Sequence, residues 1–319
     1  MSTIASYYKV NGEKLRRSYK KNLSNFATWE QKDYAEQYLV YPENISSRLA
    51  IDEISLSKGD LYTFVTSKEH TGNKKKLVAI INGTEAKIIT EVLCKINETK
   101  RNTVSEVSLD MARNMGLAVT DSFPQAAQVI DRFHVVKLVM DALQHIRVKY
   151  RWEAIDKENE EIKQAKKQAE KYSPTILENG DTLKELLARS RYLLYKTPKE
   201  FTANQTKRSE ILFQKYPIIE QAYKLTLEFR AIYENATKTI AGERLTQWMD
   251  KVKQSAIQEF NTAMNSINYH KENILNFFNR RSTNAHAESF NAKIKLFRAN
   301  LRGVTKADFF LFRLEKIFT

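Results

Sequence analysis

Three acidic residues that lie far apart in the chain are of a type that could do chemistry together. Asp52 lies within a short β-rich run, Asp110 ends a later one, and Glu288 falls in a helical stretch much further on. If one sheet makes the first two strands neighbours, a later helix could bring the third acid across. Gathered carboxylates repel one another unless a cation neutralises them, and their hard oxygen atoms suit Mg²⁺ or Mn²⁺. Two such ions, about 4 Å apart, are expected to support phosphoryl transfer at a phosphodiester.

Each acid also has a purely structural interpretation when it is considered alone. Asp52 and Glu53 could be exposed strand ends, and Asp110 could cap a helix that starts directly after it. Because Glu53 follows Asp52 on the expected strand, its side chain should point to the opposite face of the sheet. We therefore leave Glu53 out of the predicted metal site, although its part in the chemistry stays open.

Glu288 has polar neighbours that favour a functional interpretation of its helix. Asn284 lies four residues before it, Asn291 three residues after it and Lys295 seven residues after it. These spacings place all four side chains on one helical face, which a plain solvated surface does not require. We expect Asn284 and Asn291 to support the site. His286 should point elsewhere and is left out.

The segments around these acids predict alternating strands and helices. The expected strands lie in the runs LAIDEIS, LYTFVTS, KKLVAIING, TVSEVSLDM and AAQVIDRF, with helices at 84–96 and 112–119. Three strands, a helix, a strand, a helix and a strand follow the order of an RNase H-like fold. In that order the first and fourth strands of a five-stranded sheet are neighbours.

The rest of the chain predicts helices around this core. We expect a basic lead-in segment at 1–47, the first part of the core at 48–134, an all-helical insertion at 135–278 and C-terminal helices that complete the core at 279–319. Within the last two parts the pattern predicts a solvated hairpin arm at 151–171 and helices at 182–195, 207–213, 217–233, 241–264, 285–297 and 306–317. The predicted fold class is mixed α/β and rich in helix.

Composition narrows the possible partners. The 319 residues include 52 Lys or Arg and 38 Asp or Glu, and the resulting net charge of +14 favours a polyanion such as DNA. A single cysteine, Cys94, excludes a disulfide framework and a cysteine-based zinc finger within the chain. No long apolar run or signal peptide is evident, so we expect a cytoplasmic, nucleoid-associated protein with no membrane partner.

Four strings together carry a resemblance to a known family. LAIDEISLSKGDLYTFVT, VSEVSLDM, VIDRFHVVKL and STNAHAESFNAKIK occur once each and in this order. They resemble DDE transposases, in particular the insertion-sequence family ISL-three, over most of the chain from Arg48 onward. The resemblance implies an RNase H-like catalytic core interrupted by a helical insertion, with Asp52, Asp110 and Glu288 as the catalytic, metal-binding triad.

The string DRFHVVK adds further polar candidates. In similar transposases a pair that corresponds to Asp131 and His134 lies near the active site, so both are expected to support the site. His134 is equally well explained as a core histidine bonded to Asp131. Asp131 remains a rival for the second acid. Lys137, one turn beyond His134, could bind phosphate, although a lone lysine on a helix is usually solvated.

Basic residues on both sides of Glu288 predict a DNA-binding surface. The candidates are Arg280, Arg281, Lys293, Lys295, Arg298 and Arg302. A solvated basic face is the alternative, but their density beside the predicted catalytic helix favours phosphate contacts. Two aromatic residues of the insertion, Tyr192 and Trp248, could stack on an unpaired base, but we expect both to belong to the core.

Relatives of this kind typically carry an N-terminal zinc-binding and helix-turn-helix segment, which this sequence lacks. End recognition is therefore expected to come from a separate polypeptide, from a part lost by truncation or, weakly, from the basic lead-in. The leading hypothesis is a transposase that cleaves element ends and joins them to target DNA as a homodimer or larger assembly. Alternatives are an RNase H-like nuclease or resolvase without strand transfer, and an inactive DNA-binding remnant.

Overall fold

The computed structural model describes residues 2–57, 59–69, 77–281, 285–301 and 306–318. The chain forms two compact units. Unit 1 comprises Met1–Asp131 and Ser282–Thr319, and unit 2 comprises Arg132–Arg281. In the described ranges, no helix combines the length and apolar character needed to cross a membrane.

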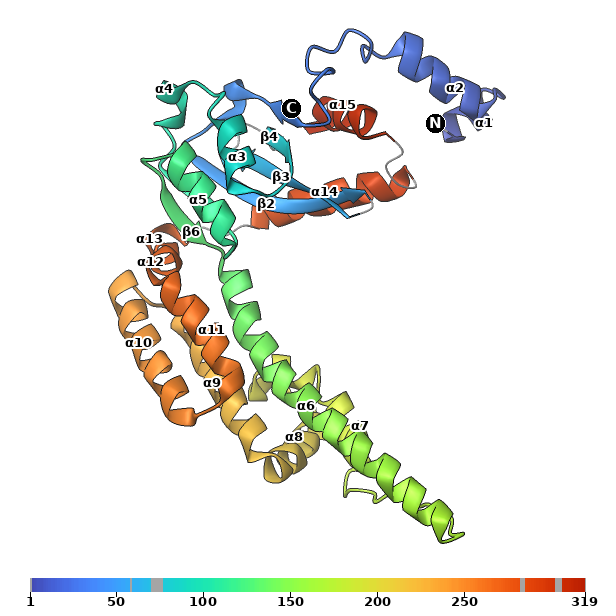
Figure 1. The fold of residues 1–319 in the computed structure, drawn as a ribbon, viewed down its shortest axis with the longest axis vertical. Coiled ribbons are helices and arrows are strands. Elements are labelled where there is room, and N and C mark those ends of the chain that lie inside the picture. The colour runs from blue at the N-terminus through green and yellow to red at the C-terminus, as the bar shows by residue number, and fades with distance from the viewer. Residues whose placement is uncertain (1, 58, 70–76, 282–284, 302–305, 319) are drawn as a thin grey trace. The chain divides into compact units, whose positions relative to one another are not determined.

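Unit 1 is built on a six-stranded mixed sheet with the strand order β1-β4-β3-β2-β5-β6 (Figure 1). The strands are β1 (Tyr38–Val40), β2 (Arg48–Ser57), β3 (Asp60–Ser67), β4 (Leu77–Asn82), β5 (Glu106–Leu109) and β6 (Ala127–Ile130). Strands β1 to β4 form antiparallel pairs, whereas β2 pairs with β5 and β5 with β6 in parallel. The first and fourth predicted strands are therefore neighbours, as the RNase H-like order requires.

Local sequence explains why these segments are strands. The runs are rich in β-branched and aromatic residues, which favour extended backbone. The β2–β3 connection passes through Gly59 at φ +95°, a backbone conformation that side chains strongly disfavour. Parallel pairing requires crossover connections, which are supplied by α3 (Ala86–Leu93) with α4 (Glu98–Arg101), and by α5 (Arg113–Ser122).

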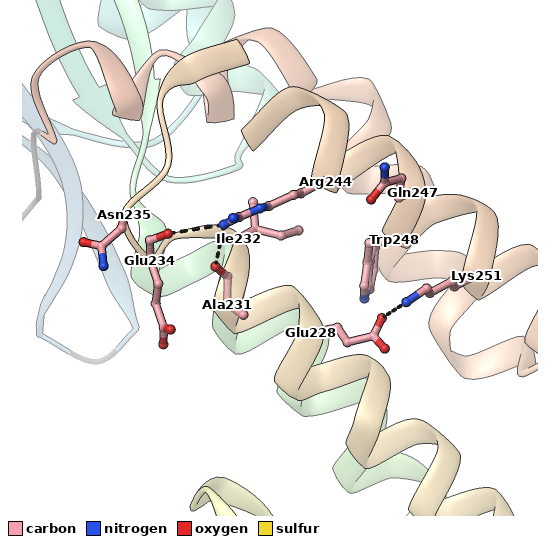
Figure 2. A pocket seen from close by; sticks show the side chains of 9 residues that line it. All are labelled: Glu228, Ala231, Ile232, Glu234, Asn235, Arg244, Gln247, Trp248 and Lys251. Atoms are coloured by element: carbon pink, nitrogen blue, oxygen red, sulfur yellow. Dashed lines mark hydrogen bonds and ion pairs between the residues drawn. The ribbon is translucent and has the colours of Figure 1, made fainter. Parts of the chain in front are cut away.

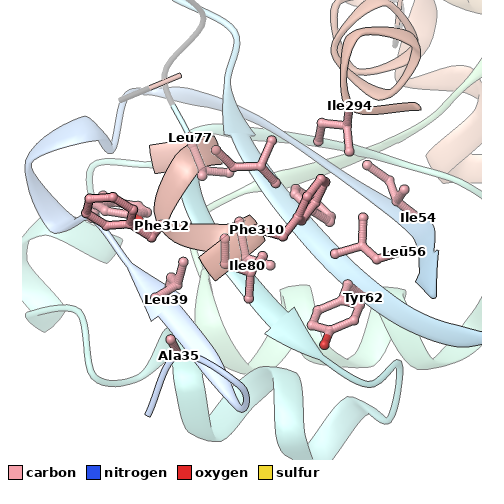
Figure 3. Close-up of a cluster of buried hydrophobic side chains, with 14 of the residues drawn as sticks. Ala35, Leu39, Ile54, Leu56, Tyr62, Leu77, Ile80, Ile294, Phe310 and Phe312 are labelled. Atoms are coloured by element: carbon pink, nitrogen blue, oxygen red, sulfur yellow. The ribbon is translucent and has the colours of Figure 1, made fainter. Parts of the chain in front are cut away.

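Helices cover both faces of the sheet (Figure 1). Helices α3 and α5 pack on one face and contact each other. The other face is covered by α14 (Ala285–Asn300) and α15 (Ala307–Phe318), whose apolar side chains join a core cluster with those of β2, β3 and β4. Figure 3 shows Ile294 and Phe310 from these helices beside Ile54, Leu56 and Tyr62. This packing fixes α14, which carries Glu288, to the sheet.

The segment expected to be a lead-in is part of unit 1 and supplies the sixth strand, β1. Before β1 the chain forms α1 (Ser2–Tyr7), α2 (Gly12–Ser18) and a π-helical turn, η1 (Tyr19–Leu23), and a 3-10 turn, η2 (Pro42–Asn44), follows β1. Glu315 on α15 accepts hydrogen bonds from Trp29 Nε1 at 2.7 Å and from the Tyr41 hydroxyl at 2.9 Å. The expectation of a five-stranded sheet was wrong because a three-residue strand gives almost no periodic signal, and β1 is held by its pairing with β4.

Unit 2 is helical throughout its described secondary structure. Its α-helices are α6 (Arg132–Lys167), α7 (Leu183–Arg189), α8 (Ala203–Lys215), α9 (Pro217–Ile232), α10 (Lys238–Ser255), α11 (Gln258–Tyr269), α12 (Lys271–Leu275) and α13 (Phe277–Arg280), with 3-10 turns η3 (Leu193–Tyr195) and η4 (Pro198–Glu200). The residues expected to start a hairpin arm continue α6 as one helix of 36 residues. The single helix expected at 241–264 is two helices, because Ala256 adopts a left-handed conformation that ends α10.

The mixed α/β class with a large helical insertion is thus confirmed. The insertion separates β6 from α14 in the sequence, so the α/β unit is made from two distant stretches of chain.

Candidate active site

The register of the parallel strands places Asp52 and Asp110 side by side. The last recorded pair between β2 and β5 joins Ala50 with Ser108. Two further residues along each strand bring Asp52 opposite Asp110, and paired residues of parallel strands point to the same face. Both side chains are partly exposed. Two acids that are 58 positions apart in the chain therefore lie side by side on one face of the sheet.

Asp52 is held by a contact from α14. Its Oδ1 accepts the backbone N–H of Glu53 at 2.8 Å, and its Oδ2 accepts the side-chain amide of Asn291 at 2.5 Å. Asn291 is buried, so its amide reaches Asp52 from a fixed position on the helix. The structure thus brings one of the predicted supporting residues onto the first predicted acid.

Asp110 combines the two interpretations that the sequence left open. Its Oδ1 accepts the backbone N–H of Ala112 at 2.8 Å, directly before α5 begins. This hydrogen bond fixes the carboxylate in an Asx-type turn and leaves Oδ2 for other ligands. A local structural role is therefore compatible with a place in the site.

Glu53 lies close to both acids, although strand alternation sends its side chain to the other face. Burial raises the pKa of the Glu53 carboxyl, and the negative charges of Asp110 and Asp52 raise it further. The three carboxylates are thus close enough to repel one another. Sequence reasoning could not predict that the Glu53 carboxyl lies close to Asp52 and Asp110. Strand alternation gives the direction of a side chain but not its distance from charged groups on a neighbouring strand.

Glu288 lies on the exposed part of α14, one turn before Asn291. Phe290 and Ile294 on the same helix are fully buried in the core cluster. A spacing of three residues places Glu288 and Asn291 on neighbouring parts of one helical face. Across the described ranges, however, no three His, Cys, Asp or Glu side chains are gathered closely enough to hold a metal ion as they stand.

Asp131 continues the row of acids across the sheet. Leu109 pairs with Ile130, so the next residues along β5 and β6, Asp110 and Asp131, lie opposite each other. The backbone N–H of Asp131 extends this ladder by donating to Leu109 at 3.0 Å, and Asp131 is only 3% exposed. His134 lies on α6 in unit 2, where its ring meets the Phe133 ring edge to face.

Lys68 is a buried residue that sequence reasoning missed. Its Nζ donates to Ser108 Oγ at 2.6 Å and lies 3.5 Å from a carboxylate oxygen of Glu106. Burial lowers the pKa of Lys68, while the negative charges of Glu106 and, more weakly, Asp131 oppose that shift. Glu106, Ser108 and Asp110 alternate onto one face of the sheet, so Lys68 places a positive charge beside the row of acids. No local pattern marks a lysine directly after a strand as buried.

The predicted DNA-binding residues fall into two groups. Lys137 is ion-paired with Asp141 at 2.7 Å, and Arg298 donates to the Ser55 carbonyl at 2.9 Å. The Arg281 guanidinium donates to two backbone carbonyls of unit 2, at 3.4 and 3.2 Å. Arg280, Lys293 and Lys295 are exposed. Asn284 and Arg302 lie outside the described residues.

The two aromatic candidates of the insertion have different environments. Trp248 is 2% exposed and donates its indole N–H to Leu225 at 2.8 Å, so the expectation of a core residue is confirmed. It lies at a cavity of about 540 Å³ between α9 and α10 (Figure 2). Tyr192 is 68% exposed, so the core expectation is wrong for this residue. Its neighbours Leu193 and Leu194 supply the buried contacts of this segment instead.

Comparisons of the sequence with known proteins show its family. The family model "DDE_Tnp_ISL3: Transposase" matches residues 49–314. The chain is 22% identical over 270 residues to the transposase for insertion sequence element IS1001 of Bordetella parapertussis, covering 85% of this chain and 60% of that protein. It is 25% identical over 250 residues to the transposase for insertion sequence element IS1557 of Mycobacterium tuberculosis (strain CDC 1551 / Oshkosh), covering 78% of this chain and 55% of that protein.

The chain thus spans little more than half the length of these curated relatives. The family match runs from within β2 to within α15, and it includes parts of both stretches of unit 1 and the whole helical insertion. It confirms the resemblance carried by the four sequence strings. On this match, the chain belongs to the ISL-three family of DDE transposases.

Proposed function

We propose that this chain is the catalytic part of a transposase that cleaves DNA at insertion-sequence ends and joins the freed 3′ ends to target DNA. The observation that carries the proposal is the alignment of Asp52 with Asp110 on neighbouring parallel strands, with Asn291 of α14 hydrogen-bonded to Asp52. This arrangement brings residues from both sequence-distant parts of unit 1 to one point. Family membership supports the same chemistry.

The donor set fits a hard divalent cation. Asp52 and Asp110 offer carboxylate oxygens from adjacent strands, and the pKa of Glu53 is raised first by burial and then by the negative charges of Asp110 and Asp52. We assign Asp52, Asp110 and Glu288 as the residues that would hold Mg²⁺ or Mn²⁺, with two ions in the complete site. When bound, the metal would neutralise the carboxylates and increase the acidity of the attacking water or hydroxyl group.

The protein's own groups orient this site. Asn291 and the Glu53 N–H each hold one oxygen of Asp52, and the Ala112 N–H fixes Asp110. Two hydrogen bonds to one carboxylate restrict its rotation, so the acid is positioned before DNA binds. We infer that Asp131 and His134 have a supporting role and that Glu288, which is exposed on α14, is the third acid of the site.

DNA would approach along the basic surface near α14. Of the predicted contacts, Lys293 and Lys295 on α14 are exposed and suited to phosphate, and Arg280 is exposed on unit 2. The other described candidates already have partners within the protein and would have to leave or share them to bind phosphate; they are Lys137, Arg281 and Arg298. The net charge of +14 favours association with any DNA segment, so these residues position the strand rather than read its sequence.

The direct test is a nicking assay with labelled DNA that carries the element's own ends. With Mg²⁺ we expect 3′-OH products, and EDTA should abolish them. Asp52→Asn, Asp110→Asn and Glu288→Gln should each reduce cleavage by at least about 100-fold, because each removes a charge that the metal site requires. Glu91→Gln, an exposed carboxylate of α3, is the matched control and should cleave normally.

Pre-cleaved ends separate the proposal from its rivals. A transposase joins them to plasmid DNA, whereas a nuclease or resolvase of the same fold yields no joined product. A chain that binds DNA but neither cuts nor joins it would be the inactive remnant. If the joining reaction proceeds with this chain alone, no separate end-recognition polypeptide is required. Cross-linking of the protein in the presence of two DNA ends tests the proposed homodimer or larger assembly.

A further inference from the structure

Unit 2 contains a group of arginines that the proposed chemistry does not use. Arg147 and Arg151 lie one turn apart on α6, and Arg191 lies in the segment that follows α7. Together with Tyr192 we call them the arginine cluster. All four residues belong to unit 2, so their arrangement can be described within one compact body.

Hydrogen bonds fix the base of the cluster. Arg147 is only 5% exposed, and its guanidinium donates to Gln144 Oε1 at 2.7 Å and to the Leu187 carbonyl at 2.8 Å. Gln144 in turn donates to the Arg191 carbonyl at 3.2 Å. Buried Arg147 therefore connects α6 to the 187–191 segment and holds Arg191 close to the helix.

The cluster gathers positive charge without compensation. Burial lowers the pKa of Arg147, and the charges of Arg151 and Arg191 lower it further. Within the described part of the chain, none of these three arginines makes an ion pair. Like charges at one place cost free energy, so an anion that binds here would gain from relieving the repulsion.

Other basic residues show that the lack of acidic partners in the arginine cluster is not general in unit 2. Lys149, also on α6, lies 3.6 Å from Glu259. In the cavity of Figure 2, Lys251 pairs with Glu228 at 2.8 Å, and Arg244 donates to two backbone carbonyls. Lys149 and Lys251 thus each have a carboxylate partner, whereas within the described residues no arginine of the cluster has one.

Tyr192 gives the cluster a flat apolar surface. Its ring is 68% exposed, and the Arg191 guanidinium lies over it at 5.3 Å from the centroid. An exposed aromatic ring beside unpaired guanidinium groups is the combination that nucleic-acid grooves use, with phosphates on the cations and a base on the ring.

We propose that the arginine cluster binds DNA, with Arg151 and Arg191 on the phosphate backbone and Tyr192 stacked on an unpaired base. The helical insertion would then be a second DNA-holding surface, separate from the acids of unit 1. This inference rests on the proposed function for its choice of DNA, but its test measures binding and not cleavage.

The experiment uses the full chain with Asp110→Asn, so that no DNA is cut, and fluorescence anisotropy with a labelled 30-base-pair duplex in EDTA at several NaCl concentrations. Arg151→Gln/Arg191→Gln should bind about 10-fold more weakly at low salt, with a salt-dependence slope smaller by about 2 because two phosphate contacts are lost. The control, Lys163→Gln/Lys224→Gln, removes the same charge from two lysines that are already ion-paired. It should bind within about 2-fold of the parent, since it loses no phosphate contact.

Tyr192→Ala tests the stacking, with Tyr269→Ala as the matched control because Tyr269 is 70% exposed. On a duplex with a single-stranded overhang, Tyr192→Ala should weaken binding by about 5-fold or more and Tyr269→Ala should not. Loss of the effect on a blunt duplex would agree with stacking on an unpaired base.

The outcomes separate this inference from the proposed function. Equal weakening by the two double variants would show that only net charge matters, and no weakening by either would also overturn the proposal. Competition with polyglutamate tests the choice of DNA. If polyglutamate displaces the labelled DNA as effectively as an unlabelled DNA oligonucleotide of equal charge, the proposal of DNA is overturned and an acidic protein is the better partner. Failure of the nicking assay alone would leave the binding result intact. Circular dichroism of each variant confirms that it is folded.

Discussion

Replacing Asp110 by asparagine should stabilise the metal-free protein while removing its response to Mg²⁺. The parallel register sets the strands that carry Asp52 and Asp110 about 4.8 Å apart. Two unit charges about 5 Å apart repel by about 3 kcal/mol at an effective dielectric constant of about 20. Because both side chains are partly exposed, we reduce this repulsion to about 1 kcal/mol.

Asparagine keeps the one hydrogen bond that Asp110 makes within the described residues. Its Oδ1 can still accept the Ala112 N–H, so the turn before α5 should persist. In EDTA we therefore expect the melting temperature of unit 1 to rise by about 2–4 °C. Saturating Mg²⁺, at about 100 times its Kd, should stabilise the native sequence by about 2.7 kcal/mol but the variant by much less. The order of the two stabilities should then reverse.

Differential scanning calorimetry of both proteins, with EDTA and with Mg²⁺, measures this reversal. Glu91→Gln removes a carboxylate whose ion pair with Lys87 is exposed, at 4.0 Å, and should change the free energy of unfolding by less than about 0.5 kcal/mol. A variant Asp110→Asn that is less stable than the native protein in EDTA, or equally stabilised by Mg²⁺, would refute the reasoning from carboxylate repulsion.

Three further predictions each concern one residue and its surroundings. Asn291→Ala removes the hydrogen bond to Asp52 and should slow nicking by about 10-fold or more. The reason is that a hydrogen bond to a charged group is worth about 1.5–3 kcal/mol. Unchanged cleavage over a range of Mg²⁺ concentrations would contradict this prediction. Ile294→Ala should lower the free energy of unfolding by about 2–4 kcal/mol in urea titrations because Ile294 is fully buried, whereas Leu296→Ala, 62% exposed on the same helix, should have little effect. Burial raises the pKa of Tyr223 to about 12, above its unfolded value of about 10, so its stabilising contribution is complete below pH 10 and is lost as pH rises from 10 to 12. Tyr223→Phe should make alkaline unfolding less steep, and an unchanged pH dependence would argue against the shift.

Local patterns were sufficient for most of the core. The β-branched runs of β2, β3 and β4 and the apolar stripe of α3 predict those elements because secondary structure there agrees with burial. Helices α14 and α15 were also predicted close to their observed bounds. The missed strand β1 and the break of α10 at Ala256 depend on one short pairing and one backbone torsion, and neither produces a repeating pattern.

Side-chain environments were less accessible to sequence reasoning. Lys68, at the end of β3, is buried where its side chain meets Glu106 and Ser108 of β5, two strands away in the sheet, and Tyr192 is exposed while Leu193 and Leu194 occupy the core instead. Residue type alone predicts the reverse for both, since lysine is usually solvated and an aromatic residue in a helical region is usually buried.

The sequence by itself determined the order of the elements, the positions of Asp52 and Asp110 at neighbouring strands and the family, because these depend on residue types and their spacing along the chain. Only the tertiary structure decided that Asn291 touches Asp52 across 239 residues, and that buried Arg147 lies close to Arg151 and Arg191, with no acidic partner for any of the three among the described residues. The physical reason is that hydrogen bonds and charge repulsion depend on distances of a few ångströms between groups that folding brings together from remote positions.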